Sequence, residues 1–188
     1  MSIACVLLAA GSGRRFGGDK LLYAPDGESM LLHSLRLHEG LDYSVRMLVA
    51  RPGDSAVIRE AEAHGFAVIE NPRHLSGIGT SAAAAAEALL ALPRQPDGVL
   101  YGVCDQPFLT RETVEGLMER FRGDPTRIVA PTCGGKRGNP VLFPGGLLPE
   151  FLSLSEDVGG SAIIRQHGDL LTLFPVSDKR ALMDIDKK

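Results

Sequence analysis

Residues 8–20 of the sequence are LAAGSGRRFGGDK, and they begin at the end of an apolar run that covers residues 3–9. An apolar run without polar alternation predicts a strand that is covered on both faces, as in a parallel sheet. Ligands of open α/β sheets bind beyond the carboxyl ends of the strands, so the loop stands where a binding site is expected. The stretch therefore predicts the first strand of an α/β sheet and a ligand site at its end.

The composition of this loop suits phosphate groups. Glycine has no Cβ, so the backbone N–H groups of a glycine-rich loop can close around phosphate oxygens. Lysine and arginine side chains add the positive charge that neutralises a triphosphate. The alternative interpretation is a glycine-rich turn whose basic side chains are merely solvated. The glycines are Gly11, Gly13, Gly17 and Gly18, and the cations are Arg14, Arg15 and Lys20.

Two common phosphate loops do not fit the stretch. A P-loop requires Gly-Lys followed by Ser or Thr, but Asp19 separates Gly18 from Lys20. A dinucleotide fingerprint requires a glycine where the chain has Phe16, and an acid where the second predicted strand is followed by Arg51. The sequence therefore disfavours both a P-loop protein and a dinucleotide-dependent oxidoreductase.

Short β-rich runs alternate with longer amphipathic stretches along the chain. The alternation predicts an α/β fold with a mostly parallel, doubly wound sheet and helices on both faces. We expect one domain over residues 1–188, with Asp54 and Thr110 as helix N-caps. The predicted strands are 3–9, 45–50, 67–69, 98–103, 127–130, 139–143, 170–175 and 181–185, and the predicted helices are 29–37, 55–64, 80–92, 111–121 and 159–167.

Composition excludes several classes of protein. The 188 residues carry a formal net charge of −3, which argues against a general nucleic-acid or membrane-surface binder, because these normally have a basic excess. The three cysteines lack CxxC spacing, which indicates reduced thiols and no structural zinc. No apolar run reaches the ~18–20 residues that span a bilayer. We therefore expect a soluble, cytoplasmic protein with no nucleic-acid or membrane partner.

Carboxylates follow two of the predicted strands. Asp105 comes after an apolar run at residues 99–104, so it faces the crevice of the N-terminal loop unless it only caps the next turn. Asp184 and Asp186 share one face of the last predicted strand, because residues i and i+2 point the same way. Mg²⁺ takes oxygen ligands from one or two carboxylates together with substrate phosphates. The sequence thus offers a candidate Mg²⁺ site.

Four motifs occur along the chain. They are LAAGSGRRFGGDK at 8–20, Asn71-Pro72 with Gly77 and Ser81, Asp105-Gln106-Pro107, and RGNPVLF at 137–143. In order and spacing these motifs resemble the nucleotidyltransferases related to the molybdenum cofactor guanylyl- and cytidylyltransferases. The resemblance spans nearly the whole chain and is greatest to the cytidylyltransferase-like branch. Phe16 and Cys104 depart from the usual Met and Gly of that pattern.

The resemblance implies a Rossmann-like, nucleotide-diphospho-sugar transferase-like fold, a Mg²⁺ cofactor and a role for each motif. Ala10, before the loop glycine, resembles the cytidylyl branch and favours CTP as the nucleoside triphosphate. Asn71 and Ser81 could equally be turn or cap residues. The implied catalytic residues are Lys20, Arg14 and Asp105; the nucleotide-binding residues are Ala9, Ala10, Gly11, Ser12, Gly13, Lys20, Asn71, Gly77 and Ser81; the acceptor-binding residues are Arg137, Gly138 and Asn139; and the metal ligands are Asp105 and Asp186, with Asp184 as the alternative.

In the implied reaction an oxygen of a phosphate monoester attacks the α-phosphate of the nucleoside triphosphate and releases pyrophosphate. Positioning and charge neutralisation suffice for such a reaction, without a covalent intermediate. The implied acceptor is a molybdopterin-type cofactor, with a molybdoenzyme as a further partner. Two other hypotheses are a nucleotidyltransferase acting on a sugar or alcohol phosphate, and a non-catalytic accessory protein that binds the molybdenum cofactor.

Overall fold

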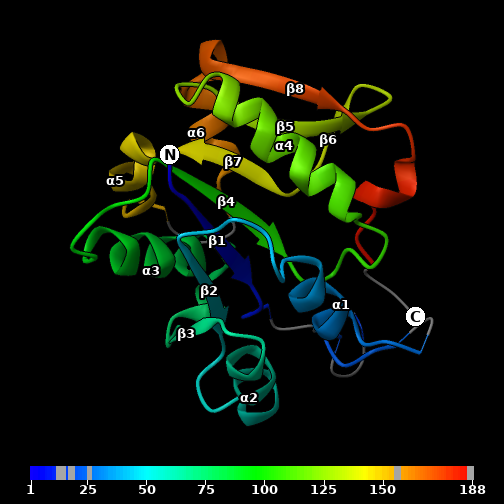
Figure 1. Cartoon of the computed structure of the whole chain (residues 1–188). Coiled ribbons are helices and arrows are strands. Elements are labelled where there is room, and N and C mark those ends of the chain that lie inside the picture. Colours follow the sequence, from blue (N-terminus) through cyan, green and yellow to red (C-terminus); the bar gives the residue numbers. More distant parts are fainter. Residues whose placement is uncertain (12–15, 17–19, 25–26, 155–157, 186–188) are drawn as a thin grey trace.

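The computed structural model describes residues 1–11, 16, 20–24, 27–154 and 158–185 (Figure 1). Strands and helices alternate along the first two thirds of the chain, as the sequence predicts. Each predicted element of this part is present, with ends shifted by up to two residues. In chain order the elements are β1 Ile3–Leu8, α1 Met30–Leu37, β2 Val45–Ala50, α2 Ser55–Ala63, β3 Ala67–Glu70, α3 Ile78–Leu90, β4 Gly98–Val103 and α4 Arg111–Gly123.

One eight-stranded sheet joins these strands to the last third of the chain. Its order is β3-β2-β1-β4-β7-β5-β6, and β8 also pairs with β5. The pairs β1–β2, β1–β4, β2–β3 and β5–β8 are parallel, whereas β7 runs antiparallel to β4 and β5. The prediction of a mostly parallel α/β sheet is thus confirmed. The bounds of the late strands are β5 Ile128–Cys133, β6 Lys136–Arg137, β7 Val141–Pro144 and β8 Leu171–Pro175.

Helices cover both faces of the sheet. Alternate residues of β1 enter two separate cores: Ile3 and Leu7 pack with residues of α1, α2 and α4, whereas Ala4 and Val6 pack with residues of α3. The second core also includes α5 (Leu148–Phe151) and α6 (Ser161–Gln166). Burial of both faces explains why β1 is apolar throughout.

Two expected N-caps have different outcomes. Thr110 caps α4, since its side-chain oxygen accepts a hydrogen bond from the backbone N–H of Thr113. Asp54 occupies the N-cap position of α2, but in the described structure its carboxylate makes no bond to the helix N–H groups. It pairs instead with the guanidinium of Arg51, at 3.0 Å from Nε.

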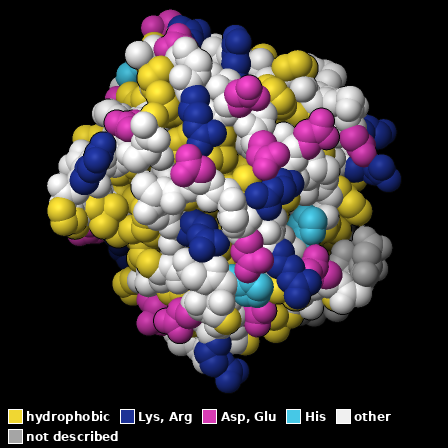
Figure 2. All heavy atoms as spheres, in the orientation of Figure 1, with side chains coloured by type: hydrophobic (Ala, Val, Ile, Leu, Met, Phe, Trp, Pro, Cys, Tyr) yellow, Lys and Arg dark blue, Asp and Glu magenta, His cyan; other side chains and the backbone are white. Residues whose placement is uncertain are grey.

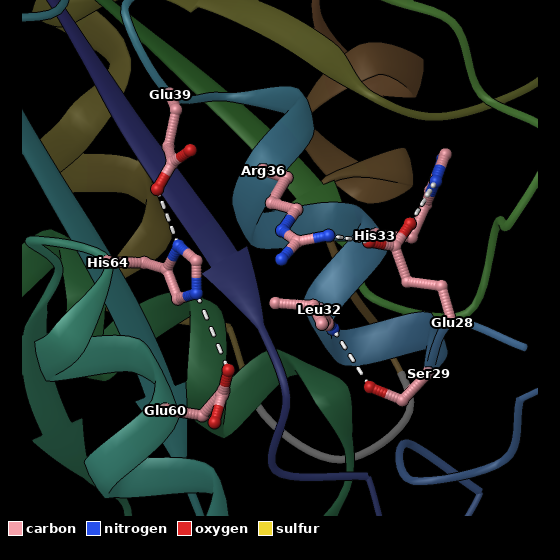
Figure 3. Close-up of polar contacts among 8 residues, drawn as sticks. All are labelled: Glu28, Ser29, Leu32, His33, Arg36, Glu39, Glu60 and His64. Carbon is pink, nitrogen blue, oxygen red and sulfur yellow. Dashed lines mark hydrogen bonds and ion pairs between the residues drawn. The ribbon is translucent and has the colours of Figure 1, made fainter.

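The start of α1 holds the segment that follows the glycine-rich loop. Ser29 caps the helix by accepting a hydrogen bond from the N–H of Leu32 at 3.1 Å (Figure 3). The backbone N–H of Leu31 donates to the carbonyl of Leu21 at 3.0 Å. Leu21 is buried in the core on this face. Helix α1 therefore fixes the chain directly after Lys20.

Charged side chains support α1 and link it to α2. Glu28 pairs with Arg36 at 2.7 Å, on the outer side of α1. His64, at the end of α2, lies between the carboxylates of Glu39 and Glu60 (Figure 3). Because Glu39 follows α1, these contacts hold the two helices together on one face of the sheet.

The predicted strand at residues 181–185 is wrong. Residues Lys179–Leu182 form a turn of 3₁₀ helix, which starts where Asp178 accepts a hydrogen bond from the N–H of Arg180 at 2.9 Å. The chain then crosses the end of the sheet, and the N–H of Ile185 donates to the carbonyl of Asp105 at 3.0 Å. The apolar residues at 181–185 therefore do not form a strand; Ala181 is buried, whereas Met183 is 47% exposed.

The described surface agrees with a weakly charged globular chain. The longest helices, α3 and α4, have 13 residues each, and no helix in the described ranges has the length and apolarity needed to span a bilayer. Acidic and basic side chains alternate over the face in Figure 2. The single domain over residues 1–188 stays a prediction, which the shared sheet supports.

Stability should depend on the buried His38. This residue ends α1, and its Nδ1 lies 2.9 Å from the hydroxyl of Tyr43. Burial, with the nearby charges of Arg46 and Arg111, lowers the pKa of His38 to about 3. An unfolded histidine titrates near pH ~6.5. The stabilisation is therefore present above that pH and is lost as the pH falls toward 3.

Urea unfolding at pH 7, 6, 5 and 4 measures this effect. We expect the titration of His38 to lower the free energy of unfolding by up to about 1.4 kcal/mol for each pH unit below pH ~6.5. The variant His38→Gln should lack this contribution, so its unfolding free energy should fall less steeply. Equal slopes for the two proteins would contradict the assignment.

Candidate functional site

The parallel pairing of β1 with β4 creates the site. Leu8 lies opposite Val103 in the register, so both strands end at the same edge of the sheet (Figure 1). The N–H of Ala9 still bonds to the carbonyl of Val49 at 2.8 Å, and Gly11 then emerges into solvent. The glycine-rich loop and the chain after β4 therefore leave the sheet side by side.

Lys20 and Asp105 meet at this edge. The Nζ atom of Lys20 lies 2.7 Å from Oδ2 of Asp105, although 85 positions separate them in the sequence. Their side chains are 14% and 24% exposed, so the ion pair is largely shielded from water. Two of the predicted catalytic residues are thus brought into contact.

The second carboxylate oxygen of Asp105 is available for a ligand. Oδ1 is buried and has no hydrogen-bond partner among the described residues. A buried carboxylate oxygen without a donor is costly, and oxygens of this kind are the ligands that hard divalent cations prefer. The donor set at Asp105 therefore fits a cation such as Mg²⁺.

Of the two late aspartates, only Asp184 is among the described residues. Asp184 is exposed and lines a cavity at the same edge, close to the bond between Ile185 and Asp105. Asp186 falls outside the described residues. The described residues contain no group of three or more potential metal ligands. A cation here would therefore take further ligands from a substrate, as Mg²⁺ commonly does.

Asn71 and Ser81 bond to each other. Asn71 is 1% exposed, and its amide nitrogen donates to the hydroxyls of Thr80 and Ser81 at 2.9 and 3.0 Å. Its Oδ1 accepts from the N–H of Arg73 at 2.9 Å. All of these bonds stabilise the loop before α3. The geometry therefore favours the turn-forming role that the sequence left open.

The other nucleotide-binding candidates are only partly described. Gly77 precedes α3 with φ 101°, a left-handed conformation that glycine adopts without strain. Ala9 and Ala10 are buried at the end of β1. The nucleotide-binding candidates Ser12 and Gly13 and the catalytic candidate Arg14 lie outside the described residues.

A cavity of about 270 Å³ is lined by Gln106, the neighbour of Asp105, and it brings the three acceptor-binding candidates together. Arg137, Gly138 and Asn139 line it, and so does Asp184. The N-terminal end of α6, with Ser161, forms another wall. The predicted acceptor residues therefore share a cavity next to the Lys20–Asp105 pair.

Sequence reasoning missed several residues of this cavity. Gln106 and Tyr101 line it, as do Phe143 and Phe151. The Asp-Gln-Pro motif could have indicated Gln106, because the residue beside a site carboxylate enters the same crevice. No local signal indicates Phe151, which reaches the cavity only through the packing of α5.

Cys104 does not belong to the reactive groups. Burial raises the pKa of its thiol to about 12, and the charge of Asp105 acts in the same direction. The thiol therefore stays protonated at neutral pH, and a protonated thiol is neither a good nucleophile nor a metal ligand.

Comparisons with known proteins identify a family and several relatives. The family model described as "MobA-like NTP transferase domain" matches residues 5–170. The chain is similar to the bifunctional protein GlmU of Cereibacter sphaeroides, with 35% identity over 63% of this chain and 26% of the relative. It is also similar to a probable molybdenum cofactor guanylyltransferase of Thermococcus kodakarensis, with 30% identity over 73% of this chain and 61% of the relative. The chain thus spans under two thirds of these relatives.

Solved structures share the fold. Rv0371c of Mycobacterium tuberculosis H37Rv superposes with a TM-score of 0.79 and 21% identity, covering 100% of this chain and 93% of the other. A manganese complex of the same protein superposes with a TM-score of 0.74 and 20% identity, covering 95% of this chain and 89% of the other. CMP:2-keto-3-deoxy-manno-octonic acid synthetase complexed with CTP superposes with a TM-score of 0.76 and 15% identity, covering 100% of this chain and 94% of the other. The fold is therefore that of the nucleotide-diphospho-sugar transferases.

The role of Asn71 can be tested by stability. We expect Asn71→Ala to lower the free energy of unfolding by about 2–3 kcal/mol, because two buried hydrogen bonds and one part-buried hydrogen bond are lost. Ser81→Ala should cost less, since the Asn71 amide keeps Thr80 as its partner. Urea unfolding measures both values. Unchanged stability of Asn71→Ala would contradict the structural role.

Proposed function

Since the chain belongs to the MobA-like NTP transferase family, we propose that it transfers a nucleotidyl group from a nucleoside triphosphate to a phosphate monoester. CTP is the favoured donor, Mg²⁺ the cofactor and a molybdopterin-type cofactor the acceptor. The observation that carries the proposal is the 2.7 Å contact between Lys20 and Asp105. It joins the two motifs that would hold the phosphates and the cation.

Lys20 binds the triphosphate in this proposal. Negative charge builds on the α-phosphate and on the leaving pyrophosphate during the reaction, and a fixed cation stabilises that charge most in the transition state. The segment that follows the lysine supports such a fixed position, because Leu21 is buried and bonded to α1. Arg14 would add a second cation.

Asp105 would hold the divalent cation through its buried Oδ1, with Asp186 or Asp184 as a second carboxylate. When bound, the cation neutralises phosphate charge and polarises the α-phosphate. The carboxylate also orients Lys20 through Oδ2. One side chain thus couples the position of the lysine to the position of the cation.

The acceptor would enter the cavity beside this pair. Arg137 lines the cavity and suits an acceptor phosphate, because a guanidinium binds phosphate through two parallel hydrogen bonds. Gly138 lies close to Leu182: a Cβ atom at position 138 would lie 3.0 Å from the Cβ of Leu182. A larger residue at position 138 would therefore crowd this wall of the cavity. A phosphate oxygen held here is itself the nucleophile, so no general base is required.

Two lines of support bear on the substrates. The similar proteins named as molybdenum cofactor guanylyltransferases support a molybdopterin-type acceptor, with a molybdoenzyme as the recipient of the product. Ala10 supports CTP over GTP as the donor, against the guanylyl donor of those names. We further propose a cytoplasmic location, which the free cysteine thiols support.

The donor and acceptor can be identified together. We expect pyrophosphate release with CTP and molybdopterin, and a kcat/KM for CTP at least about tenfold above that for GTP, ATP or UTP. A coupled pyrophosphate assay with each nucleotide measures this. Preference for GTP would overturn the CTP assignment. Turnover only with a hexose 1-phosphate or a polyol phosphate would overturn the acceptor, and tight molybdopterin binding without pyrophosphate release would indicate an accessory protein.

Two substitutions test the paired residues. Lys20→Ala should reduce kcat about 10²-fold, because one fixed charge contact in the transition state is lost. Asp105→Asn should reduce kcat similarly and raise the Mg²⁺ concentration required for half-maximal rate, because an amide binds a hard cation more weakly than a carboxylate. Mg²⁺ titrations of pyrophosphate release measure both effects.

Matched controls use exposed residues of the same types. Lys179→Ala and Asp169→Asn remove equivalent groups from the surface and should keep wild-type rates. If Asp105→Asn kept the wild-type rate and Mg²⁺ dependence, the cation site would be wrongly placed. If Lys20→Ala kept the wild-type kcat, its role in the transition state would be refuted.

A further inference from the structure

Gln106 is a cavity residue with a buried, unpaired polar atom. The residue follows Asp105, lines the cavity and is only 2% exposed. Its Oε1 is buried and has no hydrogen-bond donor among the described residues. Native structures rarely keep a buried carbonyl oxygen unpaired, because its lost hydration is not replaced. The oxygen is therefore expected to accept a hydrogen bond from a group that is not part of the described fold.

Among the described residues, no hydrogen bond of the Gln106 side chain supports the fold. The turn after β4 is held through the backbone, where the N–H of Leu109 donates to the carbonyl of Gln106 at 3.2 Å. Tyr101 also lines the cavity, but its hydroxyl donates to the carbonyl of Ala82 at 3.3 Å. The Tyr101 hydroxyl therefore does not donate to Oε1 of Gln106.

One part of the cavity wall is aromatic and aliphatic, and it suits a flat ring. Tyr101 and Phe151 stack with ring centroids 4.5 Å apart, and Phe143 meets Phe151 edge-on at 5.1 Å. All three line the cavity. Ile78 lies at the wall with 43% of its surface exposed. Such a surface gains most from a ring system that replaces water over the aromatic and aliphatic groups.

We propose that Gln106 determines acceptor specificity by accepting a hydrogen bond from a ring N–H of a flat heterocyclic acceptor. The inference rests on the proposed function, because it places the acceptor in this cavity. The ligand class is a planar heterocycle that has an N–H donor and carries a phosphate monoester. The phosphate would be held toward Arg137 while the ring occupies the apolar walls.

The proposal gives a physical basis for discrimination. An acceptor without the donor would leave Oε1 buried and unpaired in the complex. A site that is built around a hydrogen bond rejects the ligand that cannot make it far more strongly than an apolar site rejects an extra methylene. Gln106 would thus disfavour flat phosphate monoesters that place no hydrogen-bond donor at Oε1.

Binding of two phosphate monoesters tests the proposal. A phosphorylated pterin has ring N–H donors, whereas 1-naphthylmethyl phosphate has a flat ring with none. We expect Gln106→Met to weaken binding of the pterin phosphate at least about tenfold, while binding of the naphthyl compound changes less than about twofold. Isothermal titration calorimetry measures both with the full chain. Equal pterin affinity in wild type and Gln106→Met would overturn the proposal.

Stability separates this role from a structural one. Methionine has the length of glutamine but no carbonyl oxygen to leave unpaired, so the melting temperature of Gln106→Met should equal or exceed that of the wild type. Gln166→Met makes the same change at an exposed position of α6 and should alter neither affinity nor melting temperature. If Gln106→Met and Gln106→Leu both failed to fold, the side chain would be structural and the proposal would be overturned.

Turnover distinguishes failure of this inference from failure of the proposed function. Selective loss of pterin binding in Gln106→Met supports the role of Gln106, with or without pyrophosphate release by the wild type. Absence of pyrophosphate release with every nucleotide would overturn the proposed function alone. Wild-type turnover with the pterin phosphate and an unchanged KM in Gln106→Met would overturn the inference alone.

Discussion

The parallel pairing of β1 with β4 is the constraint on which the rest of the site depends. Gly102 of β4 lies beside Leu7, and a Cβ at Gly102 would lie 3.1 Å from the Leu7 side chain. This close pairing sends the glycine-rich loop and the chain around Asp105 out of the same edge. Without it, two groups separated by 85 positions would have no reason to share one ion pair. The chemistry of the site is therefore a consequence of sheet topology.

The reversed strand β7 completes the same edge. Because β7 is antiparallel to β4, its first residue Val141 lies opposite Tyr101, near the carboxyl end of β4. The residues that precede β7, including Arg137, therefore lie at the edge where the parallel strands end. A parallel β7 would have placed the residues after it there instead. The C-terminal segment reaches this edge from a third direction through the bond between Ile185 and Asp105. Two distant parts of the chain, at Lys20 and Ile185, thus contact one aspartate.

The sequence predicts the parts of this arrangement that depend on local pattern. Apolar runs and helical periodicity identify the parallel strands, and the rule that parallel strands end at one edge predicts the meeting of Lys20 and Asp105. The direction of β7 depends on which neighbours it pairs with, and no local pattern contains that information. The same holds for Asn71, because the sequence does not distinguish a buried amide that faces a ligand from one that bonds to two hydroxyls at the start of α3. The strand predicted at 181–185 is wrong because a short apolar run does not specify hydrogen-bond partners, and residues 179–182 form a 3₁₀ turn instead.

Asp105 and Gln106 each hold one buried oxygen without a donor among the described residues, and these oxygens are on neighbouring side chains. They differ in charge, so they suit different partners: a carboxylate oxygen suits a cation, and an amide oxygen suits an N–H group. Both lower the stability of the fold, and such atoms persist where a ligand supplies what the protein lacks. Two unpaired oxygens in succession at one strand end are hard to attribute to packing alone. Their position between the lysine on one side and the aromatic cavity on the other makes this dipeptide the boundary at which a phosphate-bound cation and a ring-bearing acceptor would meet.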